Sequence, residues 1–297
     1  MSPEIITGRF APSPTGPLHF GSLSCALASY LDMKKLGGHW LVRMEDIDPP
    51  REIKGASSHI LNQLEAHGLC WDGKVLFQST RLDAYQDSLN ILKEKNLAYH
   101  CECSRQRVNG LGGIYDNHCR RSNLSSTDNA TRLRLNQPNH LIEFVDQIVG
   151  HYTQSLTHDV GDFVIRRRDN LFSYQLAVTI DDQYQKVTHV MRGSDLLDST
   201  PRQIYLQRCL GFTQPQYAHL PVAISPLGQK LSKQNLASVL IPGQETLNIW
   251  AALNWLNQSP PNDLKTGSVS EILTWAISHW DSTSVKRSLT MPAPEGF

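Results

Sequence analysis

The sequence of 297 residues is long enough for one large or two medium-sized domains with a sizeable hydrophobic core. Its 28 Lys and Arg residues balance its 28 Asp and Glu residues, so the overall charge does not indicate a nucleic-acid or membrane partner. No stretch approaches the roughly 18 consecutive apolar residues of a membrane-spanning helix, and the start "MSPEIITGRF" has no apolar signal-like run. The composition therefore predicts a cytoplasmic protein, and nothing in it demands more than a monomer.

The first hundred residues alternate between strand-like and helix-like patterns. "EIITGRF" and "HWLVRMEDID" are typical of strands, whereas the residues behind "APSPTGPLHFGSL" follow a helical period that Gly37 and Gly38 can end. Two further helical patterns are "HILNQLEAHGL" and "YQDSLNILKEKNL". This alternation predicts an α/β fold with a Rossmann-type, doubly wound parallel sheet.

After residue 100 the regular pattern gives way to a segment rich in cysteine, glycine and arginine, "CECSRQRVNGLGGIYDNHCRRS". "LFSYQLAVTIDD" and "VTHVMRG" then predict strands, and "TLNIWAALNWLNQ" and "VSEILTWAISHW" predict two helices behind the loop "SPLGQKLSKQN". We therefore expect a Rossmann-type domain over residues 1–98 and 171–240, an inserted domain over 99–170, and a short helical region over 241–297.

The loop "APSPTGPLHFGSL" carries the first candidate site. His19 follows a predicted strand and falls at the start of a predicted helix, where parallel sheets bind their ligands. Gly16 and Gly21 are small enough for a phosphate to approach the backbone, and the imidazole of His19 can hydrogen-bond that phosphate. The alternative is an ordinary histidine at a helix start, which is the more common meaning of such a motif on its own.

The second candidate site is the loop "QKLSKQ". Lys230 and Lys233 are three residues apart with Ser232 between them, and two ammonium groups on a loop can close over a polyphosphate. Most sequences of this kind are solvated loops, so the interpretation depends on the loop occurring together with the site at His19.

Taken together, these motifs resemble a known family. "PSPTGPLHFGSL" resembles the HIGH motif of class I aminoacyl-tRNA synthetases and "KLSKQ" their KMSKS motif, while "RFAPSPTG", "VRMEDIDPPR" and "VTHVMRGSDLLDSTPRQIYL" resemble the glutamyl branch. The resemblance runs from Ile5 to Leu256, and it departs from the motif at Ser22, where HIGH has its second histidine.

The resemblance implies ATP-dependent activation of glutamate to glutamyl-adenylate, followed by transfer to tRNA, with ATP as a substrate together with Mg²⁺. It assigns catalytic roles to His19, Lys230 and Lys233, and implies ATP contacts from His19, Gly21, Lys230, Ser232 and Lys233. Four acidic residues look like a magnesium cluster, but we expect them to make loop and backbone hydrogen bonds instead: Asp46, Asp48, Asp181 and Asp182.

The resemblance also implies a glutamate site made of Arg9, Ser13, Glu45, Tyr174 and Arg192. The two arginines fall at the carboxyl ends of predicted strands, and a guanidinium can pair with a carboxylate through two hydrogen bonds. Glu45 can accept hydrogen bonds from the α-ammonium group, and Tyr174 can donate its hydroxyl to a carboxylate. Without the resemblance, Tyr174 has the pattern of a core residue, and the charged residues have that of surface ion pairs.

Three cysteines within 19 residues predict a structural zinc site with tetrahedral geometry: Cys101, Cys103 and Cys119. The spacing favours His100 or His118 as the fourth ligand, because imidazole is the usual partner of thiolates. The resemblance instead points to Tyr115 as the fourth ligand. The alternative is three free thiols that are neighbours by chance.

An additional domain takes roughly 100–200 residues, and the chain ends at Phe297, well short of that after Lys233. We therefore expect no anticodon-binding domain. A chain with this expected domain arrangement, "GGIYDNHCR" and an acceptor-type insertion resembles the glutamyl-Q tRNA(Asp) synthetases. The resemblance implies glutamate activation without tRNA, then attachment to queuosine at the wobble position in the anticodon loop of tRNA(Asp).

L-Glutamate, ATP and tRNA(Asp) are therefore the expected partners. Candidate phosphate contacts are Arg120, Arg121 and residues 166–168, although such charge runs are more often solvated surface. Two other functions fit the sequence less well. One is a minimal glutamyl-tRNA synthetase that charges the 3′ end of tRNA(Glu), and the other is a non-catalytic protein that binds glutamate or tRNA.

Overall fold

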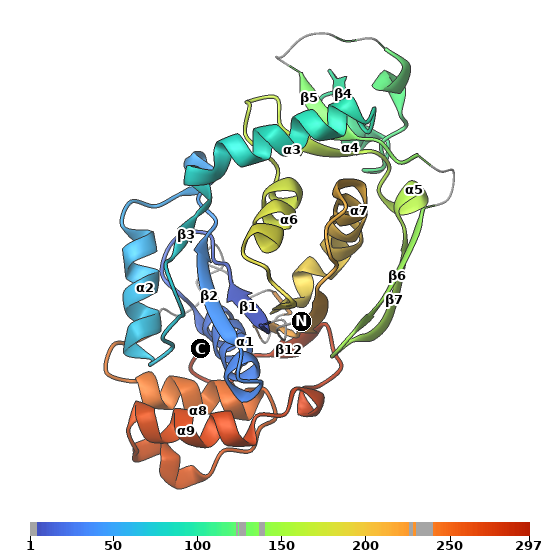
Figure 1. The fold of residues 1–297 in the computed structure, drawn as a ribbon. Helices are drawn as coiled ribbons and strands as arrows, with labels where there is room; N and C mark the ends of the chain where they lie inside the picture. The colour runs from blue at the N-terminus through green and yellow to red at the C-terminus, as the bar shows by residue number, and fades with distance from the viewer. Residues whose placement is uncertain (1–4, 123, 125–128, 137–139, 226–227, 230–239) are drawn as a thin grey trace.

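The computed structural model describes residues 5–122, 124, 129–136, 140–225, 228–229 and 240–297. Its main sheet has the strand order β3-β2-β1-β9-β10-β6-β7 (Figure 1). These strands are β1 (Thr7–Phe10), β2 (His39–Met44), β3 (Leu76–Phe77), β6 (Leu141–Asp146), β7 (Gly150–Ser155), β9 (His189–Gly193) and β10 (Gln216–Leu220). All neighbouring pairs are parallel except the β6–β7 hairpin, so the predicted parallel α/β sheet is confirmed.

Helices cover both faces of this sheet, as a doubly wound fold requires. Val190 and Met191 are neighbours on β9 but belong to different hydrophobic clusters, because successive side chains point to opposite faces. One cluster joins the sheet to α1 (Phe20–Lys35), α2 (Ala56–Ala66), α8 (Glu245–Trp255) and α9 (Val269–His279). The other joins it to α3 (Leu82–Glu94), α6 (Tyr174–Tyr184) and α7 (Thr200–Leu210).

The strand predicted over residues 171–182 is wrong, because these residues lead into helix α6. Ser173 caps this helix by accepting a hydrogen bond from the backbone of Leu176. All residues from Leu176 to Asp182 are buried, so the sequence has no polar face to show a helical period. A short apolar run of this kind does not distinguish a buried helix from a buried strand.

The expected insertion, residues 99–170, contributes to two separate sheets. A small antiparallel sheet contains β4 (Ala98–Cys101), β5 (Ala130–Leu133) and β8 (Phe163–Arg166), and α4 (Arg105–Gly110) follows β4. The β6–β7 hairpin, followed by α5 (Leu156–Asp159), instead pairs with β10 and extends the main sheet. In Figure 1 the hairpin runs from the small sheet along one edge of the molecule. The division into three domains remains a prediction.

The C-terminal region packs on the main sheet. Helices α8 and α9 lie against α1, and their apolar residues belong to the same hydrophobic cluster. Two short parallel strands, β11 (Val222–Ile224) and β12 (Thr290–Pro292), connect the last residues to the end of β10. Among the helices of the described ranges, none combines the length and the apolar character needed to cross a membrane.

Candidate active site

A cavity of about 680 Å³ lies where β1, β2, β9 and β10 end. The residues predicted for the glutamate and ATP sites that fall in the described segments all line it: Arg9, Ser13, His19, Gly21, Glu45, Tyr174 and Arg192. They meet because the carboxyl ends of parallel strands share one edge of the sheet, and the N-terminus of α1 points to the same edge. Lys230, Ser232 and Lys233 lie outside the described residues.

His19 is the N-cap residue of α1. Its Nδ1 accepts a hydrogen bond from the backbone N–H of Ser22 at 3.4 Å, and the Ser22 hydroxyl accepts one from the backbone N–H of His19 at 2.8 Å. In the neutral ring, this places the proton on Nε2. Ser22, which departs from the HIGH motif, therefore completes a capping box that holds the imidazole at the helix N-terminus.

Arg9 is held at the cavity wall by a buried ion pair. Its Nε donates to Asp182 Oδ1 at 3.0 Å, and Arg43 Nη2 donates to the same oxygen at 2.8 Å. Burial alone would raise the pKa of Asp182, but the two guanidinium groups outweigh it and hold that pKa below its ordinary value. Asp182 is the one hydrogen-bond acceptor of Arg9 among the described residues, which leaves the terminal amino groups of Arg9 for a ligand.

Glu45 is a buried carboxylate beside these arginines. Its side chain is 8% exposed, and its Oε1 lies 3.7 Å from Arg43 Nη2 without a hydrogen-bond partner among the described residues. Burial raises the pKa of Glu45 to about 7, although Arg43 and Arg9 oppose the shift. A buried acceptor without a donor costs free energy, so the site favours a ligand that brings a positively charged donor.

Arg192 is fixed by three side chains from different elements. Its guanidinium donates to Tyr174 Oη at 3.1 Å, to Thr200 Oγ1 at 2.8 Å and to His219 Nε2 at 3.1 Å. His219 Nδ1 in turn lies 2.6 Å from Asp146 Oδ2, and both residues are fully buried. Because Nε2 accepts from Arg192, the proton of the neutral ring is on Nδ1 and is donated to Asp146; burial also lowers the pKa of His219.

The four aspartates that resembled a magnesium cluster are engaged by protein groups. Asp46 accepts hydrogen bonds from the backbone and hydroxyl of Ser79, and Asp48 pairs with two arginines. Asp181 and Asp182 are held by side chains, not by the backbone as expected.

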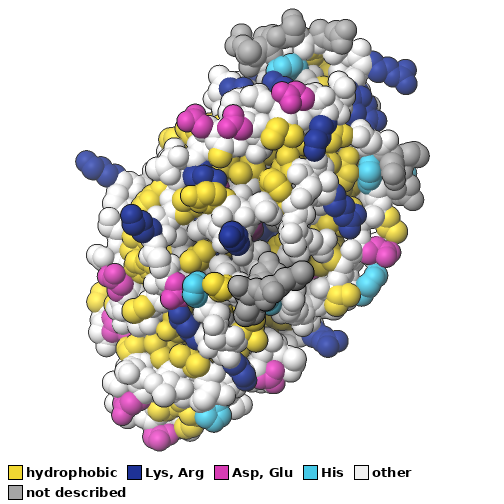
Figure 2. All heavy atoms as spheres, in the orientation of Figure 1, with side chains coloured by type: hydrophobic (Ala, Val, Ile, Leu, Met, Phe, Trp, Pro, Cys, Tyr) yellow, Lys and Arg dark blue, Asp and Glu magenta, His cyan; other side chains and the backbone are white. Residues whose placement is uncertain are grey.

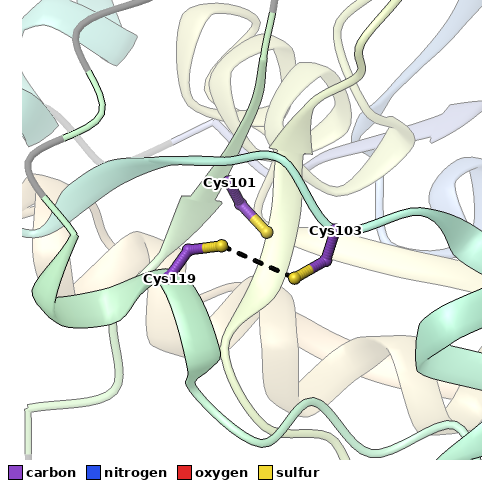
Figure 3. A group of neighbouring side chains, drawn as sticks. All are labelled: Cys101, Cys103 and Cys119. Atoms are coloured by element: carbon purple, nitrogen blue, oxygen red, sulfur yellow. Dashed lines mark hydrogen bonds between the residues drawn. The ribbon is translucent and has the colours of Figure 1, made fainter.

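The three predicted thiol ligands lie together beside the small sheet (Figure 3), with their sulfur atoms all within 4.8 Å of one another. Cys103 Sγ lies 3.5 Å from Cys119 Sγ, and with bonds of about 2.3 Å a tetrahedral zinc holds its sulfurs about 3.8 Å apart. The hydroxyl of Tyr115 lies 3.4 Å from Cys101 Sγ and 3.8 Å from Cys103 Sγ. The donor set therefore fits a closed metal site.

Neither histidine that the spacing favoured joins this group in the described ranges. His118 is exposed, and His100 follows Tyr99 and precedes Cys101 on β4, so it points to the opposite face of the strand. Arg132 places a positive charge beside the thiol group. Its Nε donates to Cys101 Sγ at 3.1 Å, and its guanidinium stacks on the Tyr115 ring at 3.8 Å.

Comparison with known proteins decides the family. The family model for class I tRNA synthetases (E and Q), catalytic domain, matches residues 5–247. The glutamyl-Q tRNA(Asp) synthetase of Pseudomonas fluorescens is 50% identical over 285 residues, which cover 96% of this chain and 95% of that protein. This chain belongs to the glutamyl-Q tRNA(Asp) synthetase family of class I tRNA synthetases. Its relative of the same name in Dechloromonas aromatica is 48% identical, with 97% of this chain and 98% of that protein covered.

Solved structures of glutamate–tRNA synthetases share the fold of this family member. The enzyme of Elizabethkingia anophelis matches with a TM-score of 0.78 at 26% identity, covering 96% of this chain and 67% of that one. A glutamate tRNA ligase of Elizabethkingia meningosepticum, solved with its amino acid, also has a TM-score of 0.78 at 26% identity. The resemblance inferred from the motifs is therefore confirmed.

The residues that support the site could not be identified from the sequence. Asp182, Asp146, Thr200 and His219 hold the two arginines in place, yet the sequence drew attention to Asp182 only as part of an apparent magnesium cluster and to the other three not at all. The signal available is their residue type, because a charged residue in a buried strand or helix needs a partner. On the face shown in Figure 2, Lys and Arg side chains are spread out and form no single basic patch.

Proposed function

We propose that this protein activates glutamate with ATP, without tRNA, and transfers the glutamyl group to queuosine at the wobble position of tRNA(Asp). The observation that carries the proposal is the large cavity, where two arginines, a helix N-terminus and a buried carboxylate meet, the carboxylate having one oxygen without a hydrogen-bond partner among the described residues. The names of the relatives, at about half identity over nearly the whole chain, support the same acceptor.

Glutamate has two carboxylates and one ammonium group, and the cavity has a partner for each. Arg9 and Arg192 are buried and rigidly held, so their guanidinium groups are oriented before the ligand binds. Glu45 accepts from the ammonium group, which supplies the donor that its Oε1 lacks. Ser13 and Tyr174 add hydroxyl groups from two sides of the cavity.

In the first step, an oxygen of the glutamate α-carboxylate bonds to the α-phosphorus of ATP, and the bond to pyrophosphate breaks. Negative charge develops on the phosphates, where the N-terminus of α1 and the Nε2–H of His19 can stabilise it. Lys230 and Lys233 are proposed to add positive charge, with Mg²⁺ bound to the nucleotide. Gly21 lines the same wall and allows the phosphates to approach.

In the second step, a hydroxyl oxygen of the acceptor bonds to the carbonyl carbon of glutamyl-adenylate. The bond from that carbon to the phosphate oxygen breaks, and AMP leaves with the hydroxyl proton. Each ester formed therefore consumes one glutamate and one ATP, and yields AMP and pyrophosphate. An exposed anticodon-loop base can reach such a cavity because it is not locked in a duplex. A cytoplasmic, monomeric enzyme is the simplest arrangement for these substrates.

We further propose that Cys101, Cys103, Tyr115 and Cys119 hold one structural zinc ion. The described residues of this segment have few buried apolar side chains, so the metal stabilises the turns around the small sheet. No residue of this group lines the large cavity, which separates the role of the metal from glutamate activation.

The zinc proposal predicts one equivalent of zinc per chain by elemental analysis, and its loss in Cys119→Ser. ATP–pyrophosphate exchange is expected to stay within about threefold, whereas proteolysis of the segment around residues 101–121 is expected to accelerate about tenfold, because the turns lose their cross-link. Cys70→Ser, at an exposed thiol, is the matched control. Purified protein without stoichiometric metal would contradict the proposal.

A further inference from the structure

A smaller cavity of about 160 Å³ adjoins the large one. The two share five lining residues: Ser13, Thr15, Glu45, Arg51 and Tyr174. The smaller cavity extends from Glu45 along the loop that follows β2 to the residues before α3 and α6. A group bound there is therefore next to the carboxylate that we assign to the ammonium group of glutamate.

Three residues that line this smaller cavity each have an acceptor oxygen without a hydrogen-bond partner among the described residues. These oxygens are the buried Oε1 atoms of Glu45, Glu52 and Gln78. Gln78 is fully buried, and its Nε2 donates to Asp181 at 2.9 Å. That bond fixes the amide, so the carbonyl oxygen is an acceptor that needs a donor from a ligand.

Glu52 is a carboxylate of the lining that has no ion-pair partner among the described residues, whereas Glu45 lies beside Arg43. Asp48 lines the cavity with Glu45 and Glu52, and the cations Arg51 and Arg167 are both paired with Asp48, at 2.5 Å and 3.3 Å. Burial raises the pKa of Glu52, and the nearby carboxylates of Asp46 and Asp48 add to the shift. The cavity therefore suits a ligand that carries a positive charge and several donors.

Queuosine, the acceptor in the proposed function, carries a positive charge and several hydrogen-bond donors. The side chain of queuosine is a cyclopentene ring with a cis-diol, joined to the base through a secondary amine that is protonated near neutral pH. It offers two hydroxyl donors and two ammonium N–H donors. The ribose at a tRNA 3′ end has a cis-diol but no cation, so it offers no ion-pair partner for the carboxylate of Glu52.

We propose that the smaller cavity binds the aminocyclopentenediol side chain of queuosine, with Glu52 pairing with the ammonium group and Gln78 accepting from a diol hydroxyl. This inference rests on the proposed function and names the residues that select its acceptor. Because Glu45 and Tyr174 line both cavities, a diol bound here lies beside the activated carboxyl group of glutamate.

The test is Glu52→Gln, measured by transfer of labelled glutamate to queuosine-containing tRNA(Asp). The expected result is a rise of at least about tenfold in the KM for this tRNA, with tRNA-independent ATP–pyrophosphate exchange unchanged. The tRNA is a polyanion, so removing a negative charge from a surface that faces it ordinarily strengthens tRNA binding. The inference predicts the opposite, namely weaker binding of this tRNA by Glu52→Gln. Glu52→Asp keeps the charge and is expected to lie between the two. Glu65→Gln, exposed on α2, is the matched control and is expected to have no effect.

Each other outcome is decisive. An unchanged or lower KM in Glu52→Gln, while the wild-type protein transfers glutamate, would overturn the binding assignment and leave the proposed function intact. A parallel loss of ATP–pyrophosphate exchange would place Glu52 in glutamate activation and also overturn the assignment. If the wild-type protein performs exchange but transfers nothing to this tRNA, the proposed function fails, and the inference fails with it.

Discussion

Replacing Glu45 with Gln is expected to lower kcat/KM for glutamate in ATP–pyrophosphate exchange by at least about 100-fold. The amide keeps the size of the side chain but removes the charge that we assign to the α-ammonium group, and charge-assisted hydrogen bonds in buried sites contribute roughly 2–3 kcal/mol. The KM for ATP is expected to change by less than about threefold, because the loss concerns the amino acid. Glu143→Gln, at an exposed position on β6, is the matched control.

The same change is expected to stabilise the free protein. The pKa of Glu45 is raised to about 7 in the folded state, so the folded protein binds this proton more tightly than the unfolded chain does. The free energy of unfolding therefore falls as pH rises from the ordinary pKa of 4.5 to about 7, and levels off above it. Glu45→Gln removes this loss, which amounts to as much as about 3 kcal/mol at pH 8 and is small at pH 5.

Two measurements check this prediction. The Tm difference between Glu45→Gln and the wild-type protein is expected to be larger at pH 8 than at pH 5. In the wild-type protein, the KM for glutamate is expected to fall about tenfold per pH unit up to about pH 7 and then level off. The variant is expected to lose this dependence. A variant that is less stable at pH 8, or that keeps wild-type glutamate kinetics, would remove Glu45 from the assigned role.

The second large effect is expected for Arg192→Ala, with a fall of about 1000-fold in kcat/KM for glutamate and little change in the KM for ATP. The guanidinium is buried and makes three hydrogen bonds to Tyr174, Thr200 and His219, so it is oriented before a carboxylate arrives. Removal of one partner from a buried charge pair costs roughly 3–5 kcal/mol. Arg192→Lys keeps the charge but loses the planar fork, so an intermediate loss is expected.

Arg202→Ala is the control for this prediction, because Arg202 lies on α7 and pairs with Asp198 outside the cavity. Circular dichroism and Tm report whether each variant folds. Unchanged glutamate affinity in folded Arg192→Ala would exclude the residue from the glutamate site. A larger effect on the KM for ATP than on that for glutamate would assign it to the nucleotide instead.

Several residues of the site could be predicted from the sequence because ligands bind at the carboxyl ends of parallel strands. Arg9, Glu45 and Arg192 each come at the carboxyl end of a strand, and parallel strands bring these ends together whatever their distance along the chain. His19 follows from the same rule, since the helix after β1 begins there. The thiol cluster followed from spacing alone, because its members are close in sequence.

The rest depends on contacts that no local pattern encodes. Arg9 and Asp182 are 173 residues apart, and Asp146 and His219 are 73 residues apart, so neither pair can be assigned without the fold. Helix α6 was predicted as a strand because burial on almost every side removed its polar face. Gln78 lies before α3 without any motif, and its role becomes visible only when the cavity brings it near Glu45 and Glu52.

The most direct test of the central claim is transfer of labelled glutamate to purified tRNA(Asp) with and without queuosine, with tRNA(Glu) assayed in parallel. ATP–pyrophosphate exchange in the absence of tRNA serves as the companion measurement. The proposed function predicts exchange without tRNA, and label on queuosine-containing tRNA(Asp) alone. Label on the 3′ end of tRNA(Glu) would contradict it and identify a compact charging enzyme.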